Sequence, residues 1–197
     1  MYRYNPDVTE PGFHHVEDQI MYWAAKGPCD LEFVPKFKGL GSDPPIDADP
    51  EMLVHYKIWN FQEDVFDEVR IKTNPEAPSR IGCIFLCPKL DSGFCSKPSE
   101  WSARTHVYEV LFSGTIFTTD SEMWTEARQD CMRALGGNMY GGAPSRWLNT
   151  AARERAKDEI SSWARSYWQG NTSYGMEESI CDGVAILGDL IYVKEDK

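Results

Sequence analysis

Residues 167–197, YWQGNTSYGMEESICDGVAILGDLIYVKEDK, contain the features that decide the predicted fold. A helix is expected to end at Trp168, because a glycine and a polar segment follow it closely. Two adjacent carboxylates, Glu177 and Glu178, then open an apolar run. The run is divided by Gly188-Asp189, which predicts a tight two-residue hairpin. A carboxylate at the entrance to a hairpin lies on a rigid edge, which suits catalysis, although edge strands also carry charges that prevent aggregation.

Three helices are predicted upstream of this stretch. Asp49-Pro50-Glu51 has the cap, proline and acidic first turn of a helix start. Asp120 can cap a second helix that runs to Leu135, and Asn149 can cap a third. Each helix has an apolar stripe at helical spacing. The residues of the first and third stripes are Val54, Ile58, Phe61, Val65 and Val69, and Ala152, Ala156, Ile160, Trp163 and Tyr167.

Short strands are predicted between these helices. They fall in residues 11–23, in DLEFV (30–34), in IGCIFLCP (81–88) and in HVYEVLF (106–112), which Ser113-Gly114 is expected to end. The order of strands, helices and hairpin indicates an α+β fold with mainly antiparallel pairing. A length of 197 residues predicts a single domain over residues 1–197.

Composition restricts the classes of function. Hydrophobic residues make up 42% of the chain, which is enough for a folded core. The formal net charge of −11 argues against non-specific binding to nucleic acid or anionic membranes. Neither a membrane span nor a secretion signal is evident. Six cysteines without such a signal are expected to be reduced thiols, which favours a cytoplasmic location.

Polar side chains at the edges of predicted strands are the candidate functional residues. Arg80 immediately precedes an apolar strand, where an unpaired cation would be costly. It therefore requires either an acidic neighbour or an anionic ligand, and the sequence favours neither. His14 and His15 lie on the first strand, where alternation allows only one of them to face a given cleft. The same alternation directs Glu177 and Glu178 to opposite faces.

Two cysteine-based sites are alternatives. Cys83, Cys87 and Cys95 could be imagined as zinc ligands, but no C-x-x-C pair occurs. Within an apolar strand cysteine behaves as a small hydrophobic residue, so no metal site is predicted. A hydrolase that uses a cysteine–histidine pair stays open, although no local motif supports it.

Four segments resemble the mono-ADP-ribosyltransferase superfamily, particularly its small bacterial and phage members. These segments are GFHHV (12–16), PSRIGCIFLCP (78–88), VYEV (107–110) and YWQG…EESICDGVAIL (167–187). The resemblance implies a split pair of antiparallel sheets with flanking helices and with NAD in the cleft between the sheets. It also implies an Arg or His on the first strand, a polar and aromatic region on the second strand, and a Glu near the end of the chain.

The resemblance assigns roles to individual residues. Glu178 would be the catalytic carboxylate, with Glu177 as the alternative, because cleavage of the nicotinamide–ribose bond develops positive charge on the ribose. Arg80 would bind the pyrophosphate of NAD, and His15 the adenosine-side ribose. An aromatic wall such as Phe85, Tyr108 or Trp168 would hold the cationic nicotinamide ring. The NAD-binding residues implied are His14, His15, Ser79, Arg80, Tyr108 and Trp168.

The function expected from this resemblance is transfer of ADP-ribose from NAD to a macromolecular acceptor, protein or nucleic acid, with release of nicotinamide. The protein would be a bacterial toxin, an effector or a phage-conflict protein, with an antitoxin or immunity protein as a partner. An alternative from another class is a non-enzymatic acidic inhibitor or decoy that binds a basic partner. Loss of NAD binding with retained partner binding would favour that alternative.

Overall fold

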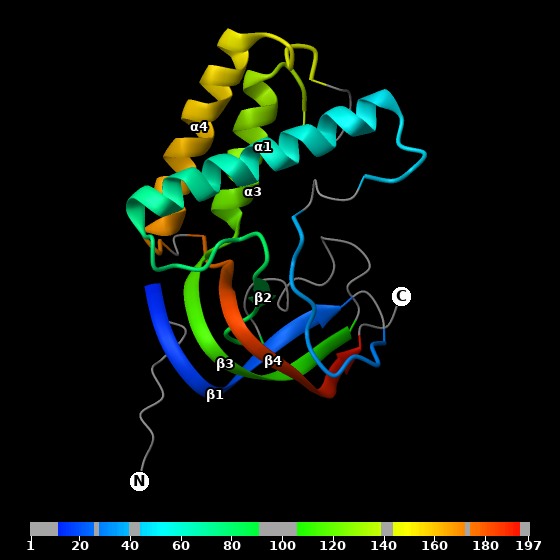
Figure 1. Cartoon of the computed structure of the whole chain (residues 1–197), viewed down its shortest axis with the longest axis vertical. Coiled ribbons are helices and arrows are strands. Elements are labelled where there is room, and N and C mark those ends of the chain that lie inside the picture. Colours follow the sequence, from blue (N-terminus) through cyan, green and yellow to red (C-terminus); the bar gives the residue numbers. More distant parts are fainter. Residues whose placement is uncertain are drawn as a thin grey trace.

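A computed structural model describes residues 12–25, 28–39, 44–90, 106–138, 144–171 and 174–193. Within these residues the fold is α+β, with three helices stacked on one end of a four-stranded antiparallel sheet of order β1-β3-β4-β2 (Figure 1). The elements are β1 (Gly12–Ala25), α1 (Pro50–Thr73), β2 (Ile84–Leu86), β3 (His106–Asp120), α3 (Glu122–Ala134), α4 (Thr150–Trp168) and β4 (Glu177–Val193). None of the helices in these described ranges is both long and apolar enough to span a membrane.

The helices begin at or close to the predicted positions. The side chain of Asp49 accepts a hydrogen bond of 2.7 Å from the Met52 backbone nitrogen, which caps α1. Asn149 caps α4 through a 2.9 Å bond from Ala152. Helix α3 begins after Asp120, whose side chain accepts a bond from the backbone of Glu122 at 3.0 Å. These side chains satisfy backbone donors that the first turn of a helix leaves unpaired.

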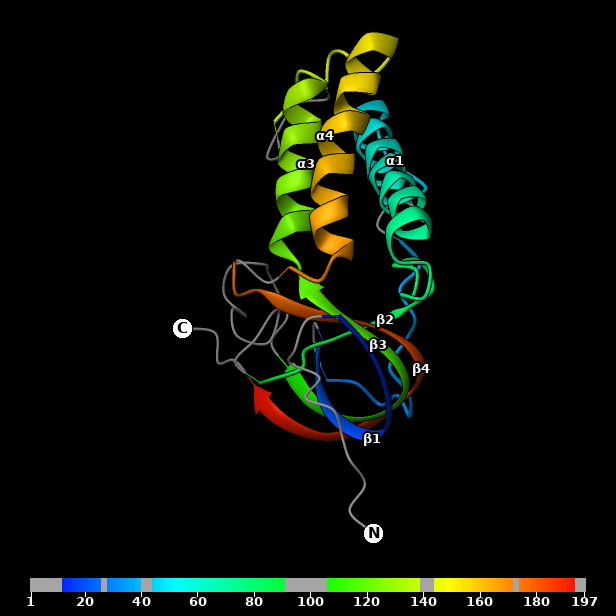
Figure 2. The same ribbon diagram turned by 90° about the vertical axis from the view of Figure 1, so that its left-hand side faces the viewer.

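The three helices stand over one end of the sheet (Figure 2), and their apolar stripes form one core with Phe117 of β3 and Ile180 of β4. The α4 stripe is confirmed, with Trp163 only partly buried. The α1 stripe differs from the prediction, because Val54 and Phe61 are only partly buried and two polar residues, Gln62 and Glu63, are fully buried. A buried carboxylate requires a partner, so Glu63 indicates an internal charge cluster.

The sheet bends sharply at one level across three strands. Gly114 of β3 has φ of +148°, and it pairs with Val16 of β1 on one side and Gly183 of β4 on the other. A Cβ atom on either glycine would run into the backbone of the opposite strand. Beside them β1 has a bulge, and its residue Asp18 has φ of +53°. Glycines and bulges are what sharp bends in strands require.

The bend wraps the sheet around a second core. A backbone bridge between Tyr22 of β1 and Cys87, directly after β2, has hydrogen bonds of 3.0 and 2.8 Å. It joins the two edges of the sheet. The enclosed side chains are apolar: Val16, Met21, Val34, Ile84, Leu86, Val110, Phe112, Ile116, Cys181 and Ala185. The sheet therefore separates this inner core from the core beneath the helices.

Strand boundaries differ from the predictions in four places. The hairpin predicted at Gly188-Asp189 is wrong, because β4 continues to Val193. Tyr108 pairs with Leu190 and Val110 pairs with Leu187. Gly188 and Asp189 therefore lie opposite Glu109 alone and form a bulge. Gly188 fits there because a Cβ atom would lie 3.1 Å from the Glu109 carbonyl oxygen.

The other three differences concern β3, β2 and the strand predicted at 30–34. Ser113-Gly114 does not end β3, because the glycine forms the bend and pairing continues to Asp120. Strand β2 has only three residues, since Gly82 has φ of +82° and belongs to a turn. Of the predicted strand at 30–34, only Phe33 forms a bridge, which it makes with Ile186. Arg80 therefore lies in the loop before β2 and not at the strand entrance.

Candidate functional site

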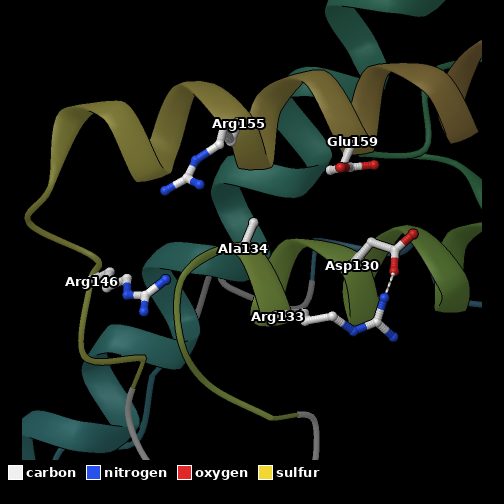
Figure 3. Close-up of a pocket in the computed structure, with 6 residues that line it drawn as sticks. All are labelled: Asp130, Arg133, Ala134, Arg146, Arg155 and Glu159. Atoms are coloured by element: carbon white, nitrogen blue, oxygen red, sulfur yellow. Dashed lines mark hydrogen bonds and ion pairs between the residues drawn. The ribbon is translucent and has the colours of Figure 1, made fainter.

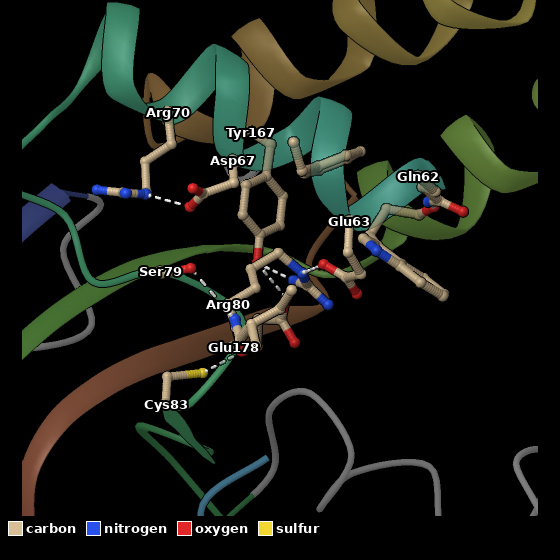
Figure 4. A network of polar contacts seen from close by, with 12 residues as sticks. Gln62, Glu63, Asp67, Arg70, Ser79, Arg80, Cys83, Tyr167 and Glu178 are labelled. Carbon is tan, nitrogen blue, oxygen red and sulfur yellow. Dashed lines mark hydrogen bonds and ion pairs between the residues drawn. The ribbon is translucent and has the colours of Figure 1, made fainter. Parts of the chain in front are cut away.

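Arg80 lies at the centre of a buried polar cluster beneath the helices (Figure 4). Its Nε donates to Glu63 of α1 at 3.1 Å, and its Nη1 donates to Glu178 of β4 at 2.9 Å. The same Nη1 donates to the hydroxyl of Tyr167 on α4. That hydroxyl in turn donates to Oε1 of Glu178 at 2.6 Å. Two helices, one strand and one loop thus meet at a single guanidinium.

Aromatic rings enclose the Arg80 guanidinium. Its Cζ lies 4.8 Å from the ring centroid of Phe85, 5.2 Å from Tyr167, 5.3 Å from Trp124 and 5.9 Å from Phe66. A cation over a ring face is stabilised by the ring quadrupole, and more strongly when water is excluded. Arg80 is 7% exposed, so its charge is satisfied by the two carboxylates and these rings.

The cluster contains two carboxylates and one guanidinium. Burial raises the pKa of Glu63 above its ordinary value, although Arg80 acts in the opposite direction. Oε1 of Glu63 has no hydrogen-bond partner among the described residues. Burial by itself would lower the pKa of Arg80, but Tyr167, Glu63 and Glu178 raise it well above its ordinary value. The guanidinium is therefore permanently charged, and burial makes Glu63 accept a proton more readily than an exposed glutamate does.

Three of the buried thiols, those of Cys83, Cys131 and Cys181, are poorly suited to act as nucleophiles. Cys83 donates from Sγ to the backbone oxygen of Arg80 at 2.9 Å, and burial raises its pKa to about 12. Burial also raises the pKa of Cys131 to about 12 and that of Cys181 well above its ordinary value. A thiol with a raised pKa is a poor nucleophile. Cys95 lies outside the described residues, within which no histidine, cysteine and carboxylate group is arranged to hold a metal.

The predicted site residues divide into two groups. Glu178 and Arg80 are in contact, and Ser79 is the neighbour of Arg80, accepting a bond from the Ile81 backbone at 3.3 Å. Trp168 packs beside the cluster, with its ring centroid 4.9 Å from that of Tyr167. Its Nε1 donates to the backbone oxygen of Phe66 at 2.8 Å.

The remaining predicted residues lie elsewhere. Glu177 is directed to the opposite face of β4 from Glu178, where Lys89 lies 4.0 Å from it. His15 of β1 pairs with Thr115 of β3, which pairs with Asp182 of β4. His15 is therefore two strands away from β4, at the level of Asp182, which is four residues after Glu178. That offset is roughly 10 Å across and about 13 Å along the sheet.

His14 occupies the adjacent row and is directed to the inner face, because its partner Ile116 belongs to the inner core. Tyr108 belongs to the other half of the bent sheet, where its hydroxyl accepts a bond from the Cys29 backbone at 2.8 Å. The cluster of described contacts around Arg80 therefore includes neither histidine nor Tyr108.

Sequence reasoning missed Glu63, Tyr167 and Trp124 as members of the cluster. One signal was available, because Gln62 lies four residues from Ile58 and three from Val65, within the predicted apolar stripe. Its side chain donates to the backbone oxygen of Trp124 at 2.8 Å. A polar residue inside an apolar stripe indicates a buried hydrogen-bond network.

Two cavities of the described residues lie elsewhere. One of about 430 Å³ lies between α1 and α4, and another of about 290 Å³ lies between α3 and α4. Neither is lined by Arg80 or Glu178. Residues lining the larger cavity are Lys57, Asn60, Phe61, Asp64, Trp147, Arg153, Glu154 and Lys157. Arg80, Glu63, Glu178 and Tyr167 are all buried, so the Arg80 cluster is a closed core in this conformation.

The fold and cluster together define an antiparallel α+β protein built around a buried Arg–Glu–Tyr network. The chain belongs to the DUF2441 family, described as proteins of unknown function, whose model matches residues 48–189. The match includes Glu63, Arg80, Tyr167 and Glu178, and begins after β1 and its two histidines. No curated protein matches the chain.

Proposed function

We propose that this protein is an NAD-dependent mono-ADP-ribosyltransferase in which Glu178 is the catalytic carboxylate. The observation that carries the proposal is the fixed position of Glu178 at the start of β4, where both Arg80 and Tyr167 donate to Oε1. A carboxylate held by preformed bonds stabilises developing positive charge without reorganisation. Because both bonds are made to Oε1, Oε2 would be the oxygen that receives a ribose hydroxyl.

The proposed reaction breaks the bond between the ribose C1′ and the nicotinamide nitrogen. The bonding electrons leave with nicotinamide, which becomes neutral, and the ribose acquires oxocarbenium character opposite the carboxylate. A nucleophilic atom of a protein or nucleic-acid acceptor then bonds to C1′ and loses its proton. The charge on Glu178 is needed mainly in the transition state, so its removal should affect rate more than NAD affinity.

The bent sheet supports an ADP-ribosyltransferase-like architecture. The corner at Gly114 and Gly183 divides one continuous sheet into two halves, and a split pair of sheets would correspond to these halves. Glu178 lies in the half beneath the helices. NAD would enter beside this half, with His15, Ser79 and Trp168 as the proposed cofactor contacts, since His14 is directed to the inner face and Tyr108 lies in the other half.

Access to Glu178 is a necessary part of the proposal. The Glu178 side chain is 2% exposed, so a ribose can reach it only when a neighbouring side chain moves. Arg80 contacts two carboxylates in the closed form, and we assign it to the positioning of Glu178. In this proposal the protein acts in the cytoplasm as a bacterial toxin, an effector or a phage-conflict protein, with an antitoxin or immunity protein as partner.

The direct test is incubation of the full chain with NAD and cell lysate as a source of acceptors. Release of nicotinamide is followed by chromatography, and transfer by mass spectrometry. Glu178→Gln should reduce transfer at least about a hundredfold, the typical effect of one charge-stabilising group, with little change in NAD affinity. Glu177→Gln is the matched control, since its side chain is directed to the opposite face of the same strand.

Two results would contradict the enzyme proposal. One is no NAD binding at millimolar concentrations together with no nicotinamide release in the presence of lysate. The other is full transfer by both glutamine variants. Loss of transfer in Glu177→Gln with full activity in Glu178→Gln would instead move the catalytic role to Glu177.

A second candidate is a non-enzymatic acidic protein that binds a basic partner. It is favoured by a specific observation, namely that Arg80, Glu63, Glu178 and Tyr167 satisfy one another inside the core. Such a cluster needs no ligand. Saturable 1:1 binding to a basic protein, with no detectable NAD binding, would support this candidate, whereas nicotinamide release that depends on Glu178 would exclude it.

A further inference from the structure

A small cavity lies between the C-terminal end of α3 and the N-terminal half of α4, beside the segment that connects the two helices (Figure 3). Its volume is about 290 Å³, and three of its lining side chains are arginines. They come from three different parts of the chain: the last turn of α3, the segment before α4, and the second turn of α4. The lining residues are Asp130, Arg133, Ala134, Arg146, Arg155 and Glu159.

The turn after α3 fixes the position of Arg146. Gly136 follows the C-cap residue Leu135 with φ of +76°, which is the conformation that commonly ends a helix. The backbone nitrogen of Arg146 donates to the Leu135 oxygen at 2.9 Å. A Cβ atom on Gly136 would lie 3.3 Å from both Cγ and Cδ of Arg146, so the arginine stem lies against this turn. The base of the Arg146 side chain is therefore held in place.

The negative charges near the cavity do not neutralise the arginines. Asp130 is already paired with Arg133, and its second oxygen accepts from Nε1 of Trp163 at 3.0 Å. Arg146 and Arg155 form no ion pair with a described residue. Glu159 lies four residues after Arg155 on α4, but the two side chains are not paired, and Figure 3 shows Arg155 directed away from it.

The neighbouring cavity provides a contrast. Its Lys157 is paired with Glu68 at 2.8 Å, and its Arg153 lies over the Trp147 ring at 5.8 Å. The arginines of the smaller cavity therefore have more donors available for a ligand. This local excess of cations is notable on a chain with a net charge of −11.

We propose that the cavity between α3 and α4 binds a dianionic phosphate group through Arg146 and Arg155, with Arg133 as a third cation. A planar guanidinium presents paired donors that match phosphate oxygens, and two of them from different elements can hold one group from two sides. A cavity of about 290 Å³ fits a small phosphorylated molecule. The site is lined by neither Arg80 nor Glu178 and does not rest on the proposed transferase function.

The test uses the full chain at low ionic strength, with calorimetric titration of inorganic phosphate and of glycerol 3-phosphate. Saturable 1:1 binding with a Kd of about 1 mM or below is expected for at least one of them. Tighter binding of glycerol 3-phosphate would identify a phosphomonoester as the ligand, and equal or weaker binding would identify free phosphate. Dimethyl phosphate, which carries one charge, should bind more weakly than either.

Variants locate the site. Arg146→Gln and Arg155→Gln should each weaken binding about ten- to hundredfold, as expected for loss of a charge-assisted bond. Arg165→Gln is the matched control, because Arg165 is an exposed arginine of the same helix outside the cavity. Glu159→Gln should strengthen binding, because it removes a repulsive charge from the lining. Circular dichroism of each variant establishes that the fold is retained.

Three outcomes would overturn the proposal. The first is no saturable binding of either phosphate compound. The second is equal weakening by Arg165→Gln and Arg155→Gln, which would indicate general charge attraction. The third is tighter binding of a short single-stranded oligothymidylate than of both phosphate compounds, with Arg165 contributing as much as Arg155, which would indicate an extended nucleic-acid surface.

Discussion

The two arginine environments of this protein are opposites. Arg80 is buried among two carboxylates, a tyrosine hydroxyl and four aromatic rings. Arg146 and Arg155 are exposed at the far end of the helical layer and form no ion pair with a described residue. Around Arg80 the acidic groups outnumber the cation, whereas around the small cavity the arginines outnumber the acids.

The difference teaches what each arginine can contribute. Removing a charge from water is costly, so a buried guanidinium requires acidic partners. If the guanidinium is removed, those partners are left as unpaired buried charges. An exposed guanidinium loses little solvation and contributes little to stability, but it keeps its donors for a ligand. We therefore expect Arg80 to stabilise the fold and Arg146 and Arg155 to serve binding. The four predictions below test that division.

The largest effect is expected for Arg80→Ala. The substitution leaves Glu63 and Glu178 buried without their cation, which typically costs about 3–5 kcal/mol. For a chain of this size the melting temperature should fall by roughly 6–20 °C. Chemical denaturation gives the free energy of unfolding, and thermal melts give the temperature shift.

Arg165→Ala is the matched control, since it removes an exposed arginine from α4 and should change stability by less than about 0.5 kcal/mol. An unchanged melting temperature in Arg80→Ala, together with weakened NAD affinity, would show that Arg80 serves a ligand. That outcome would remove the distinction between the two arginine environments.

Much of the fold was predictable because local signals determine it. The caps at Asp49 and Asn149 and the α4 stripe depend on neighbouring residues alone, and they predicted α1 and α4 closely. Gly114 and Gly188 misled the strand predictions, because a glycine that ends a strand and one that bends or bulges it have the same local sequence. Which of these occurs is decided by a partner strand far away in the chain.

The polar cluster was predictable only in part. Sequence reasoning recognised that Arg80 needs an acidic neighbour or an anionic ligand, and Glu178 is one such neighbour. It could not select Glu63, which is one of several acidic residues in α1, because burial of one helix face depends on how α1 crosses α4 and the sheet. The roles of His14 and His15 and the single-domain organisation stay predictions.

A smaller loss of stability is expected for Tyr167→Phe. The hydroxyl accepts from Arg80 and donates to Glu178, so its removal leaves both groups short of a partner inside the core. The ring remains and still packs on Phe66, with centroids 5.3 Å apart. We expect a loss of about 1–3 kcal/mol in the free energy of unfolding, measured in urea.

Tyr174→Phe is the control for this substitution, because Tyr174 is 50% exposed. It should be close to neutral. Equal stability of the two phenylalanine variants would indicate that the Tyr167 hydroxyl contributes nothing to the cluster, and that the two carboxylates are satisfied by Arg80 alone.

Glu63→Gln should change how stability depends on pH. Burial raises the folded-state pKa of Glu63 above the ordinary value of 4.5, so the associated stabilisation is complete below about pH 4.5 and is lost as pH rises through the folded value. Glutamine cannot ionise. The free energy of unfolding of the variant relative to wild type should therefore increase as pH rises above 4.5, by at most about 1.4 kcal/mol per pH unit.

Urea denaturation at a series of pH values between 4 and 8 measures this trend. Glu177→Gln is the control for removing one carboxylate, because the Glu177 side chain is 22% exposed and lies outside the Arg80 cluster. A constant difference between wild type and Glu63→Gln over the whole series would mean that Arg80 keeps Glu63 ionised throughout, in spite of its burial and its unpaired Oε1.

The smallest effect on stability is expected at the other arginine environment. The double variant Arg146→Gln, Arg155→Gln removes two like charges from one small cavity, so in the absence of phosphate it should be neutral or more stable by a few tenths of a kcal/mol. Because both residues are exposed, salt should screen their repulsion, and any gain should disappear at about 1 M sodium chloride. Denaturation at low and high salt checks both statements.

In phosphate buffer the order should reverse, because wild type is stabilised by a ligand that the variant binds poorly. A large loss of stability in the variant without phosphate would show that these arginines hold the fold as Arg80 does, and the contrast between the two environments would fail.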